Sequence, residues 1–142
     1  MLQQLMSSTH VFFYKLSGGR IGGRMHKVPV LLLTTTGRKT GRKRTTPLLY
    51  ARDGNRPVIV ASNGGRPLDP SWWMNLKHNP IAMVQVKDVK QTIYAQRAIG
   101  SEKDRLWQMM ASLYPSYDDY QKRTNREIPI VVLRPKISDT SA

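Results

Sequence analysis

The chain has 142 residues, enough for one hydrophobic core, and its 39% content of hydrophobic residues excludes a disordered polymer. It contains no cysteine, which excludes disulfides, thiolate metal sites and cysteine nucleophiles. An excess of Lys and Arg over Asp and Glu, 23 against 9, gives a formal net charge of +14. Such a charge indicates an anionic partner, which composition alone leaves open as nucleic acid, an anionic membrane surface or a strongly anionic small ligand. We predict one domain over 1–142.

The first segment, 1–16, carries apolar residues at spacings of three and four, which predicts an amphipathic helix. Polar residues interrupt it too often for a signal peptide, and no run approaches the ~20 apolar residues of a membrane-spanning helix. We expect a cytoplasmic protein. The helix either packs over the domain or, together with Arg20, Arg24 and Lys27, lies peripherally on the anionic inner face of the cell membrane.

Six segments are rich in β-branched and aliphatic residues and are predicted to be strands: 28–36, 45–52, 58–61, 81–87, 91–98 and 128–133. Asp53-Gly54 and Asp88-Val89 are hairpin turn signals, so neighbouring strands should pair antiparallel. Few crossover helices separate these strands, which favours a barrel over a wound parallel sheet. The predicted fold class is α+β, mainly β. We expect the tail over 135–142 to be frayed.

Two helices are predicted between the strands. Asp69-Pro70 supplies a start signal for the first, and Asn79-Pro80 ends it. The second begins where Ser101 and Asp104 resemble a capping box, and it ends before Pro115.

The segment 34–46, TTTGRKTGRKRTT, joins the first two predicted strands and is called the basic loop below. Gly37 and Gly41 allow tight turns around five cations, which are Arg38, Lys39, Arg42, Lys43 and Arg44. Side-chain and backbone donors of such a loop can surround a phosphate or several carboxylates. The loop is not a P-loop, because Arg and Lys follow Gly41. Five cations within seven residues repel one another, so we favour an anion-binding loop over a solvated hairpin tip.

Other catalytic patterns are poorly supported. The histidines, His10, His26 and His78, lie far apart without a carboxylate at ligand spacing, so no metal site is expected. Ser62 lies in no G-x-S-x-G context, and no G-x-G-x-x-G follows a strand. The chemistry is therefore expected to come with a bound cofactor.

Tyrosines recur every three residues at Tyr114, Tyr117 and Tyr120, where Ser116 signals a short helical turn. A tyrosine offers a flat face for stacking and a hydroxyl that can donate a hydrogen bond. Because acidic residues separate Tyr117 from Tyr120 in a polar stretch, we expect this pair to lie outside the core.

Four segments, 28–50, 58–65, 70–80 and 114–133, resemble the deazaflavin-dependent nitroreductase family of actinobacteria. The resemblance implies a split β-barrel of the FMN-binding type with six or so antiparallel strands and peripheral helices. It also implies bound coenzyme F-420, whose tail carries a phosphodiester and several glutamates. The implied activity is hydride transfer from reduced F-420 to a small-molecule acceptor, either quinone-like or nitroaromatic.

The same resemblance assigns roles to individual residues. The cofactor tail would be held by Arg38, Lys39 and Arg44 and would continue along Thr45, Thr46 and Pro47. The ring would be lined by Ala61, Ser62 and Asn63, with Trp72 as a wall. The acceptor would lie against Trp72 and under Tyr114, Tyr117 and Tyr120, where Tyr117, or else Ser62, donates a hydrogen bond to the developing anion. Asn63 stands where lysine is expected in the member that activates bicyclic nitroimidazoles, so activity on those compounds is not implied.

Two alternatives stay open. The first is an FMN-dependent reductase on the same barrel, because the basic loop could equally hold a simple phosphate. The second is a basic nucleic-acid-binding barrel, favoured by the net charge and disfavoured by the lack of an exposed aromatic and basic strand motif. We therefore expect no nucleic-acid partner, and the sequence leaves the oligomeric state open.

Overall fold

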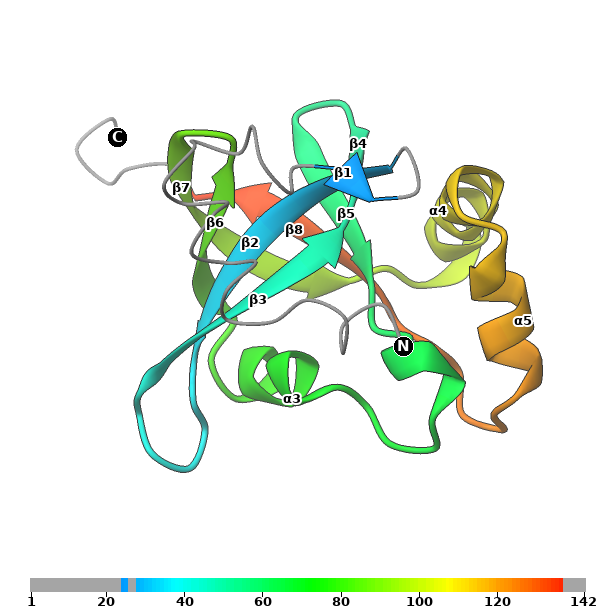
Figure 1. Cartoon of the computed structure of the whole chain (residues 1–142), viewed down its shortest axis with the longest axis horizontal. Helices are drawn as coiled ribbons and strands as arrows, with labels where there is room; N and C mark the ends of the chain where they lie inside the picture. The colour runs from blue at the N-terminus through cyan, green and yellow to red at the C-terminus, as the bar shows by residue number, and fades with distance from the viewer. Residues whose placement is uncertain (1–23, 26–27, 137–142) are drawn as a thin grey trace.

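The computed structural model describes residues 24–25 and 28–136 (Figure 1). The predicted helix over 1–16, most of the basic segment that follows it and the tail beyond Lys136 lie outside the described residues. Pro135, where the frayed tail was expected to begin, is the last residue of a strand and pairs with Ile93.

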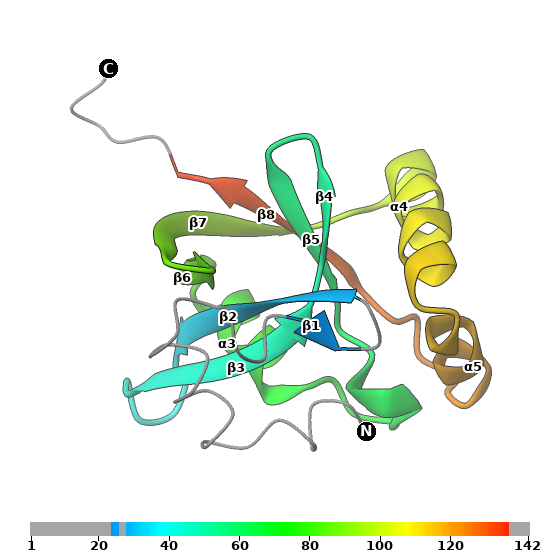
Figure 2. The ribbon, with the colours of Figure 1, turned by 45° about the horizontal axis from the view of Figure 1, so that its top comes forward.

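The described elements run in the order β1 (Arg24–Met25), β2 (Val28–Thr36), β3 (Lys43–Leu49), β4 (Ala51–Asp53), β5 (Arg56–Val60), a 3-10 helix η1 (Asn63–Gly65), α3 (Ser71–His78), β6 (Ile81–Val86), β7 (Val89–Arg97), α4 (Gly100–Leu113), α5 (Ser116–Lys122) and β8 (Ile130–Pro135). Every pair of neighbouring strands is antiparallel, as predicted. The sheet order is β1-β2-β6-β7-β8-β5-β4, and β3 also pairs with β2. Figure 2 shows the twisted sheet curling into a split barrel, with α4 and α5 beside it.

The continuous apolar run of β2 is buried on both faces, as its sequence predicts. Leu31 and Leu33 pack into the barrel interior, while Val30 and Leu32 belong to a second cluster with Leu49. A third cluster joins the outer face of β5 and β8 to α4 and α5, and it contains Val58, Val60, Leu106, Met110 and Val132. Truncating a fully buried side chain such as Leu106 to alanine typically costs about 2–5 kcal/mol, so this cluster attaches the two helices firmly to the sheet.

The predicted strand over 45–52 is in fact two strands. Its first part begins at Lys43 and pairs with β2, while its last part is β4 and pairs with β5. Tyr50 separates the two, and its N–H still donates to the Pro29 carbonyl at 3.1 Å. The chain therefore changes partners at a barrel corner. An apolar pattern continues through such a corner, so the sequence does not reveal it.

Both predicted helices are present, but the predicted side-chain caps are wrong. The N-cap of α3 is Pro70 and that of α4 is Ile99, and neither helix start has a side-chain cap bond. Asp69 instead accepts a hydrogen bond from Arg126 Nη1 at 3.0 Å. Its carboxylate serves tertiary structure rather than the helix start.

Candidate cofactor site

The basic loop is a tight backbone turn between β2 and β3. Gly37 N–H donates to the Arg42 carbonyl at 2.8 Å, and Gly41 N–H donates to the Gly37 carbonyl at 2.8 Å. Gly41 has a φ of +72°, and a Cβ on Gly37 would come within 3.1 Å of the Arg42 oxygen. The two glycines therefore give the loop a shape that other residues would strain.

A pocket of about 600 Å³ opens between this loop and α3. The pocket is lined by most of the residues predicted to hold the cofactor tail, which are Arg38, Lys39, Arg44, Thr45 and Thr46. Pro47 is buried in β3 opposite Leu32 and does not line the pocket. The structure thus brings together most of the predicted tail-binding residues.

Asn75 of α3 positions Arg38. Its Oδ1 accepts from Arg38 N–H at 3.1 Å and from Arg38 Nη1 at 2.8 Å, and its Nδ2 donates to Thr35 Oγ1 at 3.1 Å. Ser71 Oγ accepts a further bond from Arg38 Nη1 at 3.0 Å. Neither Asn75 nor Ser71 was predicted as a site residue from the sequence. Asn75 is only 3% exposed. The signal in the sequence was a polar residue among the apolar residues Trp72, Trp73 and Leu76 of a short helix, which indicates a buried polar side chain with a specific partner.

Cationic groups of the loop remain available to a ligand. All side-chain bonds of Arg38 use Nη1, so its Nε and Nη2 groups have no protein acceptor within the described residues. Lys39 and Arg44 are exposed, and no ion pair of the described chain includes either of them. A planar guanidinium with free donors suits a phosphate or carboxylate.

Trp72 forms an inner wall of this pocket. Its indole Nε1 is buried and has no hydrogen-bond partner in the described structure. A buried donor without an acceptor costs about 1–3 kcal/mol. An acceptor atom of a bound ligand would satisfy it, so both the charges and the wall fit an anionic cofactor with polar groups along its length.

None of the predicted ring-binding residues Ala61, Ser62 and Asn63 lines this pocket. Ala61 belongs to the same buried cluster as Trp72, and Ser62 is 6% exposed. Asn63 has a φ of +47°, and its Nδ2 donates to the Leu68 carbonyl at 3.0 Å. The Asn63 amide group therefore shapes its own loop.

Gly65 connects this segment to the tyrosines. It has a φ of +80°, and a Cβ there would lie 2.8 Å from the Tyr120 carbonyl oxygen. Only a glycine lets η1 approach the backbone of α5 so closely. In Figure 1 the basic loop and α3 lie below the barrel and α5 lies at its right, with η1 next to α5.

The three tyrosines form one cluster. Ring centroids are 5.0 Å apart for Tyr114 and Tyr117, 6.3 Å for Tyr114 and Tyr120, and 6.2 Å for Tyr117 and Tyr120. The hydroxyls of Tyr114 and Tyr120 lie 3.3 Å apart. The expectation that Tyr117 and Tyr120 lie outside the core is wrong: they are 5% and 6% exposed and pack with α4. Their acidic neighbours, Asp118 and Asp119, are exposed, and Asp118 Oδ1 accepts a hydrogen bond from Trp107 Nε1 of α4 at 2.8 Å.

Burial disfavours the ionised forms of Tyr117 and Tyr120. It raises the pKa of Tyr117 well above its usual range. Burial, together with the hydrogen bond to Tyr114, raises the pKa of Tyr120 to about 12. Both hydroxyls therefore keep their protons near neutral pH and can act as hydrogen-bond donors.

Within 24–25 and 28–136, no group of three or more His, Asp or Glu side chains is placed to hold a metal ion. The helices of the described region are all too short or too polar to cross a membrane.

The antiparallel split barrel with a cationic pocket beside the basic loop has the fold of flavin and deazaflavin reductases. The family model described as "F420H(2)-dependent quinone reductase" matches residues 6–135. The chain belongs to this family.

Individual proteins similar to this chain carry names of the same family. A curated Mycobacterium tuberculosis protein named as an F420H(2)-dependent quinone reductase is 44% identical over 128 residues, covering 87% of this chain and 86% of the relative. A second M. tuberculosis relative with that family name is 37% identical and covers 82% of this chain and 99% of its own. A solved structure described as an F420-H2 dependent reductase has a TM-score of 0.69 and 38% identity, covering 75% of this chain and 94% of its own. The predicted split-barrel fold, the F-420-dependent reductase class and the cofactor are thereby confirmed.

Proposed function

We propose that this chain binds F-420 with its anionic tail in the pocket between the basic loop and α3, and passes a hydride to a quinone held near the tyrosine cluster. The observation that carries the proposal is Arg38. Asn75 and Ser71 fix its Nη1, while Nε and Nη2 have no acceptor among the described residues. Donors fixed in place before binding lose little conformational entropy on binding, which raises affinity for a phosphate or carboxylate.

The tail would bind to Arg38, Lys39 and Arg44, with Thr45 and Thr46 continuing along it. Thr45 Oγ1 is already hydrogen-bonded to Thr34 Oγ1 at 2.8 Å, which fixes that edge of the pocket. Trp72 would wall the inner end, and Ala61, Ser62 and Asn63 would line the ring. The tail assignments rest on the pocket's lining, and the ring assignments rest on the family resemblance and on the burial of Ala61 and Trp72 in one apolar cluster.

Bound reduced F-420 supplies a hydride, and a quinone that accepts it also takes up one proton to become the hydroquinone. The protein's part is orientation and charge stabilisation. Tyr117 is protonated near neutral pH, because the ordinary pKa of a tyrosine is 10.0 and burial raises it further, so its hydroxyl can donate a hydrogen bond to the oxygen on which negative charge develops. Ser62 is a second candidate donor. Tyr114, Tyr120 and Trp72 would hold the flat acceptor.

Fluorescence titration tests the cofactor assignment. We expect oxidised F-420 to bind more tightly than FMN and than a tail-free deazaflavin. Arg38→Met should weaken F-420 binding by about tenfold or more, because a charge-assisted hydrogen bond contributes about 1.5–3 kcal/mol. Arg134→Met, which removes an exposed cation of β8 outside the pocket, is the matched control. Tighter binding of FMN, or equal losses in the two variants, would contradict the proposal.

Contact with an anionic membrane belongs to the same proposal, because quinones are lipid-soluble and the chain is strongly cationic. Sedimentation with anionic liposomes of the full chain, and of the chain lacking 1–16, tests it. Unaltered lipid binding after the deletion would count against that segment as the anchor. Reduction of nitroaromatic acceptors remains a prediction, which steady-state kinetics with reduced F-420 and a nitroaromatic compound would test.

A further inference from the structure

Arg126 lies between α5 and β8 and binds a segment some sixty residues earlier in the chain. Its Nη2 donates to the Ser62 carbonyl at 2.8 Å, its Nη1 to the Ala61 carbonyl at 3.2 Å, and its Nε to the Arg66 carbonyl at 3.0 Å. Nη1 also donates to Asp69 Oδ1 at 3.0 Å. One guanidinium therefore holds four acceptors within 61–69, three of them on the main chain.

The segment 61–69 needs such support. It leaves β5 and reaches α3 without pairing in the sheet, apart from one bond from Ala61 N–H to the Pro129 carbonyl at 2.9 Å. Its internal bonds are those of a turn, such as Gly65 N–H to the Ser62 carbonyl at 2.9 Å. Arg66 and Leu68 are exposed and bury little apolar surface. Ala61 and Gly65 are packed, but 66–68 is exposed and has little packing to hold it.

Arg126 is itself held by α5. Gln121 Nε2 donates to the Arg126 carbonyl at 2.8 Å, and Gln121 Oε1 accepts from Ile128 N–H at 3.0 Å. The guanidinium thus connects 61–69 to the helix that carries Tyr117 and Tyr120. Lysine cannot reproduce this arrangement, because a single ammonium group lacks the planar set of donors that reaches several acceptors.

We propose that Arg126 is a positioning residue for the ring end of the cofactor site, fixing Ala61 and Ser62 relative to the tyrosines. The inference rests on the proposed ring-binding role of 61–63. It divides the site into two independently supported ends: Asn75 fixes Arg38 at the tail end, and Arg126 fixes the backbone at the ring end. Removing Arg126 should therefore disturb the ring end and spare the tail end.

Hydrogen–deuterium exchange of the whole protein tests this without any turnover. In the cofactor-free protein, Arg126→Met should speed exchange of amides in 61–69 by about tenfold or more and leave the basic loop unchanged. Saturating F-420 should protect both segments in the wild type. In Arg126→Met it should protect only the basic loop, and the affinity for a tail-free deazaflavin should fall by at least about tenfold.

Arg105→Met is the matched control, because Arg105 also pairs through two nitrogens, both to Asp53 at 3.0 Å, on another part of the molecule. It should leave protection of 61–69 intact. In Arg126→Lys the exchange rate of amides in 61–69 should lie between those of the wild type and of Arg126→Met. This variant tests the inference should the methionine variant unfold. Wild-type protection of 61–69 by F-420 in Arg126→Met, or in Arg126→Lys should the methionine variant unfold, would overturn the inference. Absence of protection at both segments in the wild type would instead overturn the proposed function.

Discussion

Asn75 and Arg126 have the same physical role at two ends of one site. Each is a polar side chain that a neighbouring element supplies, and each bonds several groups of the segment it supports. Asn75 bonds Arg38 and Thr35 of the basic loop, and Arg126 bonds main-chain carbonyls of 61–69. Asn75 is buried, so leaving its partners unsatisfied would carry the full penalty of buried polar groups. The loops that would bind the ligand are therefore kept in shape before it arrives.

Tyr117→Phe tests the proposed donor. Phenylalanine keeps the buried ring and removes only the hydroxyl, so the fold and cofactor affinity should stay near wild type. Turnover with a quinone should fall by at least about tenfold, because one hydrogen bond to the developing oxyanion is lost. Steady-state kinetics beside an F-420 titration measures the two effects separately. Tyr94→Phe, at an exposed tyrosine of β7, is the control, and unchanged turnover in Tyr117→Phe would remove Tyr117 from the mechanism.

Individual site residues could be predicted from the sequence where their charge is unusual, but not where their bonding partners are distant along the chain. The cations of the basic loop are conspicuous in any reading, and the pocket contains most of them. Asn75 and Arg126 act on residues 37 or more positions away, so no local spacing reveals them. The polar flanks of Tyr117 were misleading, because α5 has one buried and one exposed face.

Helices and strands of this protein are joined by a few close contacts that fix their relative positions. Gly65 lets η1 lie against α5, Tyr50 marks the change of sheet partner, and Asp53 links a hairpin to α4. The predicted strands correspond to β2 through β8, with the one over 45–52 divided into β3 and β4, whereas β1 (Arg24–Met25) was not predicted. The corner at Tyr50 was not predicted either, because a run of residues that stays apolar shows nothing of a change in pairing partner.

Gly65→Ala tests the contact between η1 and α5. The added Cβ meets backbone rather than a flexible side chain, and the φ of +80° disfavours alanine in addition. Gly54→Ala is the matched control, because Gly54 has a similar φ of +66° but open space around its Cβ position. Urea unfolding should show about 1–3 kcal/mol more destabilisation for Gly65→Ala than for Gly54→Ala. Equal losses would mean that the close approach costs nothing beyond backbone strain.

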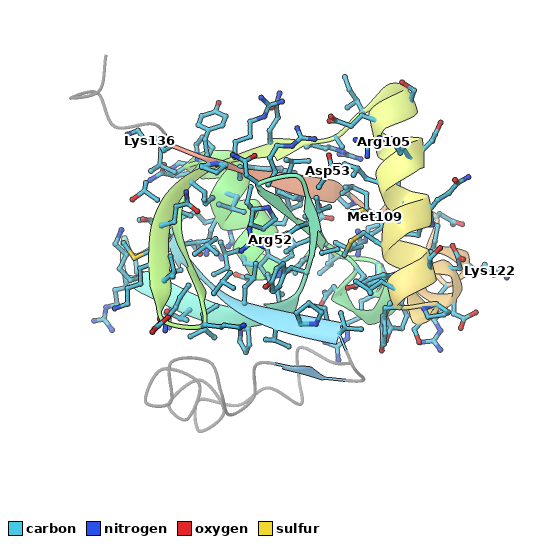
Figure 3. All side chains as sticks on the ribbon, turned by 90° about the horizontal axis from the view of Figure 1, so that it is seen from above. Arg52, Asp53, Arg105, Met109, Lys122 and Lys136 are labelled. Carbon is cyan, nitrogen blue, oxygen red and sulfur yellow. The ribbon has the colours of Figure 1, made fainter. Side chains whose placement is uncertain are left out.

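Asp53 should make the attachment of α4 sensitive to acid. Figure 3 shows Arg105 of α4 beside Asp53 of the β4–β5 hairpin. Hydrogen bonds from Arg105 and then Arg56 hold the pKa of the Asp53 carboxyl well below its usual range. A depressed pKa in the folded state stabilises the fold above the unfolded-state value of 3.8 and loses that effect as pH falls further.

The stability difference between the wild type and Asp53→Asn should accordingly be constant from pH 7 down to about 5 and shrink below about 4. Urea unfolding at several pH values measures it. Asp88→Asn, at an exposed carboxylate in the β6–β7 turn, should show no comparable change. A difference that stays constant down to pH 2 would exclude Asp53 as the acid-sensitive group.

The described cations behind the formal net charge of +14 fall into two groups, those that form ion pairs and those that do not. Arg56, Lys77, Lys103, Arg105 and Arg126 form ion pairs that join elements, while Lys39 and Arg44 of the pocket take part in none of the ion pairs of the described chain. The fold class followed from strand patterning and turn signals. The partner did not follow from charge alone, because a cofactor tail and a nucleic acid both carry several negative charges.

Ionic strength should separate these two polyanions. A short tail held by a few cations loses affinity gradually, so raising NaCl from about 50 to 500 mM should weaken F-420 binding by roughly tenfold and leave a tail-free deazaflavin almost unaffected. Non-specific DNA binding releases many counterions and should fall by several orders of magnitude over the same range. Arg38→Met should flatten the salt dependence for F-420, whereas Arg134→Met should not. DNA binding that outlasts F-420 binding at high salt would mean that the excess charge serves nucleic acid, and the basic loop would then need another explanation.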